Sequence, residues 1–152
     1  LIELFEKLKK EGIHTCIDTS GSVVINDQMK KLIDLTDLFL LDIKCINDEV
    51  CKDLTGVSNK KELEFARYLS DNNKKMWIRQ VLVPAYTDDE KDLKELSKFI
   101  KSLNGVEKIE ILKYHNLGKF KWEKLNLKYP LENYRVANEA DVKRAKEIMN
   151  IE

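Results

Sequence analysis

Hydrophobic and polar residues follow two patterns along this chain, one typical of strands and the other of helices. Short apolar runs predict four buried strands, at residues 13–17, 37–43, 75–83 and 106–113. Apolar residues at helical spacing predict helices between and around them, at residues 1–10, 27–35, 48–54, 60–69 and 139–149. Thr87 and Glu90 have the spacing of a capping box, which predicts one more helix before Gly105. Strands that alternate with such helices are typical of parallel βαβ units, so we expect an α/β fold.

The length of the chain is that of one domain. Its 152 residues can bury a sizeable core, and residues 1–152 are expected to form a single unit. Four strands cannot close a barrel of about eight, and the apolar strand at residues 13–17 needs a neighbour. The chain also starts at Leu1 within an amphipathic helical pattern, with no helix-capping residue before it. We therefore expect that this chain is the C-terminal portion of a longer protein.

Composition narrows the class of protein. Hydrophobic residues make up 43% of the chain and charged residues 36%, which is typical of a folded, soluble domain. The 27 basic residues balance the 27 acidic ones, so charge gives no reason to expect nucleic acid or a membrane surface as a partner. No apolar run approaches the ~20 residues needed to span a bilayer. Three cysteines without disulfide-like spacing favour a reducing, cytoplasmic location.

Polar residues follow the predicted strands. Asp18, Asp42, Lys44 and His115 lie at or just after strand ends, and the carboxyl ends of parallel strands meet at one edge of a sheet. Each residue alone has an ordinary explanation, as a turn residue, a solvated lysine or a hydrogen-bonded histidine. The prediction of a shared site depends on all of them lying at the same edge.

The charged residues among these define the candidate chemistry. Asp42 and Lys44 are two positions apart and share a face of a strand, where they could pair or hold a zwitterionic ligand. Arg79 interrupts a run suited to a strand buried on both faces, so it needs an anionic ligand or a structural ion pair. Asp18 and Thr19 offer oxygen ligands for a cation, or they cap the following turn.

The cysteines do not form a metal-binding pattern. Cys16, Cys45 and Cys51 are separated by 29 and 6 positions, unlike the common zinc or iron–sulfur motifs. Buried or incidental thiols are the simpler interpretation. We therefore expect no iron–sulfur ligand in this chain.

Several segments, in their order and spacing, resemble the pyruvate formate-lyase-activating enzymes, which are radical S-adenosylmethionine (SAM) proteins of the glycyl-radical-enzyme activase family. These segments are residues 18–21, 36–44, 54–59, 77–79, 83–84 and 114–122. The CxxxCxxC motif that binds the family's 4Fe–4S cluster is absent from this chain. The resemblance implies a partial (β/α)6 TIM-like barrel, to which this chain would supply strands three to six.

The resemblance also implies an activity in anaerobic metabolism. The full enzyme would use S-adenosylmethionine and a 4Fe–4S cluster to produce a 5′-deoxyadenosyl radical, which removes a hydrogen atom from a glycine of pyruvate formate-lyase. Flavodoxin or ferredoxin would supply the electron. Without the cluster motif, this chain alone is expected to be inactive.

Residue roles are also implied by matching position. Four residues would contact S-adenosylmethionine, namely Asp42, Lys44, Arg79 and His115. A monovalent cation would be held by Asp18, Thr19 and the backbone carbonyl of Leu40.

One alternative lies within the same class of enzyme, and two lie outside it. The chain could belong to an activase of another glycyl radical enzyme. It could instead be part of a metal-free β/α-barrel aldolase with Lys44 as the Schiff-base amine, although no glycine-rich phosphate loop follows a late strand. A non-enzymatic interaction domain is the third alternative.

Overall fold

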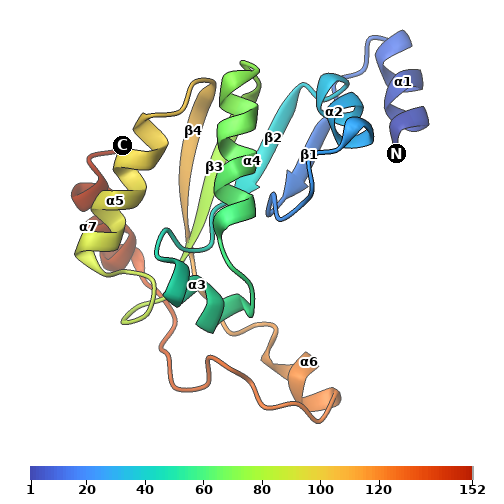
Figure 1. Ribbon diagram of the computed structural model, residues 1–152. Helices are drawn as coiled ribbons and strands as arrows, with labels where there is room; N and C mark the ends of the chain where they lie inside the picture. The colour runs from blue at the N-terminus through green and yellow to red at the C-terminus, as the bar shows by residue number, and fades with distance from the viewer. Residues whose placement is uncertain (152) are drawn as a thin grey trace.

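The computed structural model describes residues 1–151 and contains one parallel sheet flanked by helices (Figure 1). Its strands are β1 (Cys16–Thr19), β2 (Leu38–Asp42), β3 (Lys75–Leu82) and β4 (Val106–Lys113). They lie side by side in the order β1-β2-β3-β4, and every neighbouring pair is parallel. This arrangement confirms the predicted α/β fold with four parallel strands.

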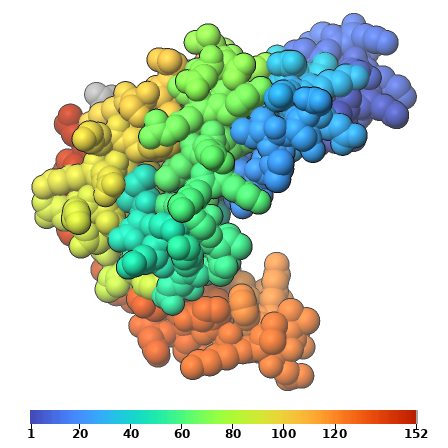
Figure 2. Space-filling view, in the orientation of Figure 1, coloured from blue at the N-terminus to red at the C-terminus, as the bar shows by residue number. Residues whose placement is uncertain are grey.

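Within residues 1–151, one helix precedes β1, four lie between successive strands and two follow β4. They are α1 (Ile2–Lys10), α2 (Asp27–Asp34), α3 (Asp48–Thr55), α4 (Lys60–Asp71), α5 (Glu90–Lys101), α6 (Lys119–Lys124) and α7 (Glu139–Met149). The segment around α6, orange in Figure 2, stands away from the body of the molecule. Within residues 1–151, the longest apolar helical stretch is too short to cross a membrane.

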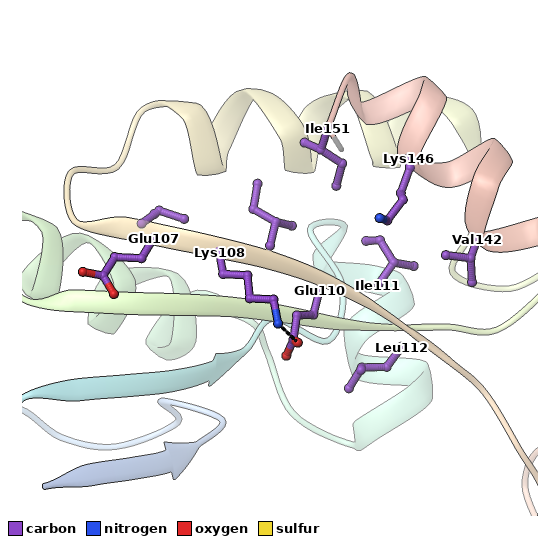
Figure 3. Close-up of a pocket in the computed structure, with 10 residues that line it drawn as sticks. Glu107, Lys108, Glu110, Ile111, Leu112, Val142, Lys146 and Ile151 are labelled. Atoms are coloured by element: carbon purple, nitrogen blue, oxygen red, sulfur yellow. Dashed lines mark hydrogen bonds and ion pairs between the residues drawn. The ribbon is translucent and has the colours of Figure 1, made fainter. Parts of the chain in front are cut away.

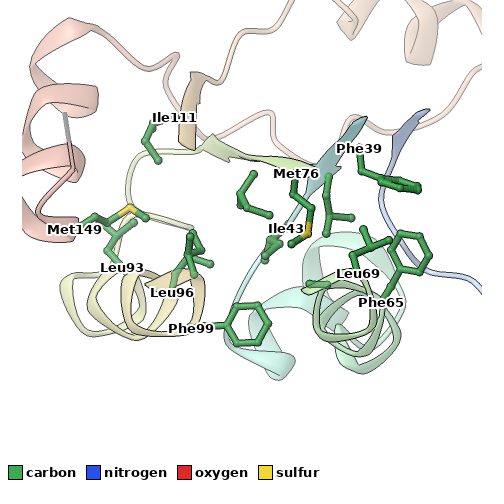
Figure 4. Packing of buried hydrophobic residues seen from close by; sticks show 14 of the residues in the cluster. Phe39, Ile43, Phe65, Leu69, Met76, Leu93, Leu96, Phe99, Ile111 and Met149 are labelled. Carbon is green, nitrogen blue, oxygen red and sulfur yellow. The ribbon is translucent and has the colours of Figure 1, made fainter. Parts of the chain in front are cut away.

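The core lies on one face of the sheet. Successive side chains of a strand point to opposite faces, and in β3 fully buried positions alternate with partly exposed ones from Met76 to Leu82. The buried face packs against α4 and α5 through large apolar side chains, among them Phe39, Met76, Phe65, Leu69, Leu96 and Phe99 (Figure 4). Burying each of these contributes about 1.5–3 kcal/mol. The opposite face of the sheet remains available for polar side chains.

The first strand begins later than the sequence pattern predicts. We expected a strand at residues 13–17, but β1 covers Cys16–Thr19 because β2, its partner, begins only at Leu38. Thr15 is tied to the residue before β2, since its N–H donates to Asp37 Oδ2 at 2.8 Å and its carbonyl accepts from the N–H of Asp37 at 3.0 Å. Residues before Thr15 therefore have no strand to pair with.

Two further local features differ from the prediction. The Thr87 hydroxyl accepts from the N–H of Val83 at 2.8 Å and donates to the carbonyl of Val81 at 3.1 Å, so it closes the turn after β3 instead of capping a helix. The capping residue of α5 is Asp89, whose carboxylate accepts two backbone N–H groups of the first turn. The sequence pattern predicts no helix between β4 and α7, but the short helix α6 lies there.

Candidate functional site

Four predicted site residues form one chain of ion pairs on the open face of the sheet. Arg79 Nη2 lies 2.5 Å from Asp18 Oδ1, and Arg79 Nε donates to Asp42 Oδ1 at 2.9 Å. The other carboxylate oxygen of Asp42 accepts from Lys44 Nζ at 2.6 Å. Negative and positive charges therefore alternate along four residues, Asp18, Arg79, Asp42 and Lys44, which together form the ion-pair row.

The register of the strands explains this convergence. Asp42 and Arg79 are direct neighbours in the β2–β3 ladder, and Asp18 pairs with Leu40 in the β1–β2 ladder. The long arginine side chain therefore reaches diagonally across β2 to the edge strand. Lys44 lies two residues beyond Asp42 and turns to the same face.

Arg79 lies in a less buried position than the sequence suggests. We expected β3 to be buried on both faces, but only one face is packed and Arg79 occupies the other. Its side chain is still only 17% exposed. Burial alone would lower the pKa of Arg79, but the hydrogen bonds and charges of Asp18 and Asp42 more than offset this and raise it. The guanidinium is thus held in its charged form.

His115 lies at the same edge of the sheet but outside the ion-pair chain. The N–H of Tyr114 donates to the carbonyl of Leu82 at 3.1 Å, which extends β4 by one residue and places His115 beyond the carboxyl end. The His115 side chain is exposed, and within residues 1–151 it makes no hydrogen bond to the four paired residues. The structure thus joins four of the five expected side chains in one set of ion pairs, and the fifth, His115, lies outside that set.

The residues proposed to bind a cation are Asp18, which belongs to the ion-pair row, and its neighbours Thr19 and Leu40. Asp18 and Leu40 are register partners, and the Thr19 hydroxyl accepts the N–H of Gly21 at 3.0 Å. Oδ1 of Asp18 is already paired with Arg79, while the side chain as a whole is 60% exposed. No cluster of three or more His, Cys, Asp or Glu side chains suited to a metal occurs in the described part of the chain. A cation here would therefore depend on one carboxylate with hydroxyl and carbonyl oxygens.

The cysteines lie in positions that do not suit metal ligation. Cys45 and Cys51 are buried, and Cys16 is exposed on β1. Burial raises the pKa of Cys45 to about 12 and also raises the pKa of Cys51. Metal ligation requires thiolates, so the two buried thiols are poor ligands.

Sequence reasoning missed a second polar group on the open face. Lys108 Nζ lies 4.6 Å from the centre of the Trp77 ring and 2.6 Å from Glu110 Oε1. Glu110 is the register partner of Arg79, so this group continues the charged row onto β4. The signal available in the sequence was the period-2 alternation of Lys108 and Glu110 within an apolar strand.

A buried carboxyl behind Lys44 was also missed. The Glu62 side chain lies in α4, its residue is 4% exposed, and Oε1 accepts the backbone N–H of Lys44 at 3.2 Å. Burial raises the pKa of the Glu62 carboxyl to about 7. The sequence signal was its position one helical turn before Phe65 and Ala66, on the buried face of α4.

A hollow of about 730 Å³ lies elsewhere, between β4 and α7 (Figure 3). Its walls combine apolar side chains, such as Ile111, Val142 and Ile151, with Lys146 and the edge of β4. None of the predicted site residues lines it. The candidate site is therefore the ion-pair row and not this hollow.

Comparisons with known proteins show the family of the chain. The Radical SAM superfamily matches residues 1–97. The pyruvate formate-lyase 1-activating enzyme of Escherichia coli K12 is 44% identical over 146 residues, which cover 95% of this chain and 59% of that protein. The pyruvate formate-lyase-activating enzyme of Staphylococcus epidermidis is 47% identical over 155 residues, 99% of this chain and 62% of that protein. The chain thus spans about three fifths of the length of these relatives.

Solved structures show the same fold at lower identity. A domain of pyruvate-formate lyase-activating enzyme from Bacteroides vulgatus superposes with a TM-score of 0.78 at 22% identity, covering 99% of this chain and 83% of that one. Streptococcus suis SuiB bound to its precursor peptide gives a TM-score of 0.72 at 18% identity, covering 98% of this chain and 31% of that one.

Proposed function

Because this chain belongs to the radical SAM superfamily, we propose that it forms the S-adenosylmethionine-binding part of a glycyl-radical-enzyme activase. The observation that carries the proposal is the row of alternating charges on the open face of the sheet. We further propose pyruvate formate-lyase as the enzyme that is activated, since the relatives described above are named as its activating enzymes. In this proposal the chain supplies strands three to six of a six-stranded partial barrel in a cytoplasmic protein.

The row fits the methionine end of S-adenosylmethionine, which is a zwitterion. Its carboxylate would pair with Arg79 or Lys44, and its ammonium group with Asp42, in place of the present contacts among these side chains. In such an exchange, Asp42 and the cationic side chain that binds the carboxylate each keep a partner of opposite charge. S-adenosylmethionine supplies the radical chemistry of the superfamily when it is bound to a reduced cluster.

Two further roles belong to the same proposal. His115 would contact the ligand from the carboxyl end of β4, where its exposed side chain has no partner in the ion-pair row. Asp18, Thr19 and the carbonyl of Leu40 would hold a monovalent cation once Arg79 turns from Asp18 to the ligand. The electron would come from flavodoxin or ferredoxin.

The cysteines of this chain do not fit the 4Fe–4S cluster. Cys45 and Cys51 are buried thiols with raised pKa values. They lie in the loop after β2 and in α3, whereas Cys16 lies on β1. We therefore propose that an upstream segment carries the CxxxCxxC motif, and that the chain without it has no activase activity.

The contacts of Lys44 bear on the alternatives. Lys44 Nζ is paired with Asp42 at 2.6 Å, and an ammonium group held by a carboxylate lacks the free electron pair that a Schiff base requires. This disfavours the aldolase. Activation of a different glycyl radical enzyme is the second candidate function. Either activase would bind S-adenosylmethionine through the same ion-pair row.

The coding sequence upstream of Leu1 provides a simple test. We expect an open frame that encodes CxxxCxxC, because the matched relatives are longer than this chain. An upstream segment that encodes a different domain, without three closely spaced cysteines, would contradict the proposed function.

A further inference from the structure

We propose that Glu62, together with Asn59, positions Lys44 for its ligand and makes that positioning dependent on pH. The identity of the ligand, S-adenosylmethionine, rests on the proposed function. Glu62 is a positioning residue, because its carboxyl group contacts the backbone of Lys44 and not the open face of the sheet.

The contacts form a clamp on the loop after β2. Glu62 Oε1 accepts the N–H of Lys44 at 3.2 Å, while Asn59 Nδ2 donates to the carbonyls of Cys45 at 3.0 Å and Ile46 at 2.6 Å. Asn59 caps α4 and Glu62 lies in its first turn, and the two residues are 3% and 4% exposed. The N-terminal end of α4 therefore holds the backbone of three successive loop residues, numbers 44–46, by hydrogen bonds.

Asn59 is itself held in place. Its backbone N–H donates to Asp48 Oδ1 at 3.1 Å, and the same oxygen accepts from the Ser58 hydroxyl at 2.6 Å. Lys52 pairs with the other oxygen of Asp48 at 2.6 Å. The clamp is thus joined to α3 as well as to α4, and it leaves Lys44 little freedom except in its side chain.

Glu62 is the member of the clamp whose charge can change near neutral pH. The titratable groups that face it are Asp42 and Lys44 at the end of β2, Cys45 in the loop and Cys51 in α3. Lys44 favours the ionised carboxyl and Asp42 disfavours it, while burial, the largest influence, raises the pKa of Glu62 to about 7. The thiols of Cys45 and Cys51 stay neutral, because burial raises their pKa values.

Ionisation of Glu62 should strengthen ligand binding. An ionised carboxylate accepts a stronger hydrogen bond from the Lys44 N–H than a protonated one does. It also adds a negative charge behind the site, which favours a ligand that carries a sulfonium cation. Both effects have the same sign, so S-adenosylmethionine should bind more tightly above pH 7 than below it.

The test compares three forms of the full-length protein: the wild type, Glu62→Gln and Glu64→Gln. Glu64 is exposed on the same helix and serves as the matched control. Calorimetric titration with S-adenosylmethionine should show that the wild-type Kd rises about fivefold from pH 8 to pH 6, beyond any rise in Glu62→Gln. Glu64→Gln should follow the wild type. A Glu62→Gln profile as steep as that of the wild type would overturn the proposal.

A second measurement separates this inference from the proposed function. In nuclear magnetic resonance spectra without ligand, the amide shift of Lys44 should titrate near neutral pH in the wild type and not in Glu62→Gln. A titrating amide in a protein that does not bind S-adenosylmethionine would contradict the proposed function and leave the clamp supported. A Lys44 amide that is insensitive to Glu62 would overturn the clamp, whatever the ligand.

Discussion

Replacement of Asp42 by alanine is expected to weaken S-adenosylmethionine binding by about tenfold to a hundredfold in the full-length protein, because one charged hydrogen bond contributes about 1.5–3 kcal/mol. Asp42 is the centre of the charge row: its two oxygens contact Arg79 and Lys44, and in the proposed complex it would receive the ligand's ammonium group. The free energy of unfolding should fall less, by about 1 kcal/mol, since Arg79 keeps its pair with Asp18.

Calorimetric titration and thermal denaturation of the same samples would measure both effects. Asp34→Ala is the matched control, because Asp34 is largely exposed at the end of α2 and lies 4.0 Å from its only ion-pair partner in the described residues, Lys74. This control should bind S-adenosylmethionine as the wild type does. A large loss of stability in Asp42→Ala with unchanged affinity would show that the row is a structural ion-pair network.

Replacement of Gly105 by alanine should lower the free energy of unfolding by roughly 3 kcal/mol, through a left-handed backbone and a direct clash. Gly105 has a φ of 75°, and a Cβ there would lie 2.3 Å from the backbone oxygen of Lys74. The Gly105 carbonyl also accepts the N–H of Met76 at 2.8 Å, so Gly105 links the N-terminal ends of β3 and β4.

Gly12→Ala is the matched control for this substitution. Gly12 has a similar φ of 69°, but beyond Gly12 itself and its two chain neighbours no heavy atom of the described residues lies within 4 Å of the Cβ position. We expect a loss of about 1 kcal/mol, from the backbone conformation alone. Urea denaturation of both variants would separate the two contributions, and equal losses would show that the contact with Lys74 relaxes without cost.

Local signals in the sequence were sufficient to predict several elements. The predicted limits of the fourth strand and the last helix, residues 106–113 and 139–149, coincide with those of β4 and α7. Gly105 and Asn138, a left-handed glycine and a capping side chain, mark where these elements begin. The pairing of Asp42 with Lys44 also followed from a spacing of two residues within one strand.

Features that depend on distant residues were not predictable in the same way. The limits of β1 are set by where β2 begins, so the apolar residue Ile13 lies outside the strand although its own pattern favours one. The two partners of Arg79 come from other strands, which left the choice between a ligand and an ion pair open. The role of Glu62 depends on a backbone N–H in a loop 18 residues earlier, which no side-chain pattern records.

The most direct test of the proposed activity is electron paramagnetic resonance of pyruvate formate-lyase after anaerobic incubation with the full-length protein, S-adenosylmethionine and reduced flavodoxin. We expect a glycyl radical signal that requires S-adenosylmethionine and is strongly reduced with Asp42→Ala. The absence of that signal, under conditions in which a positive-control activase produces it on the same substrate protein, would contradict the proposed function.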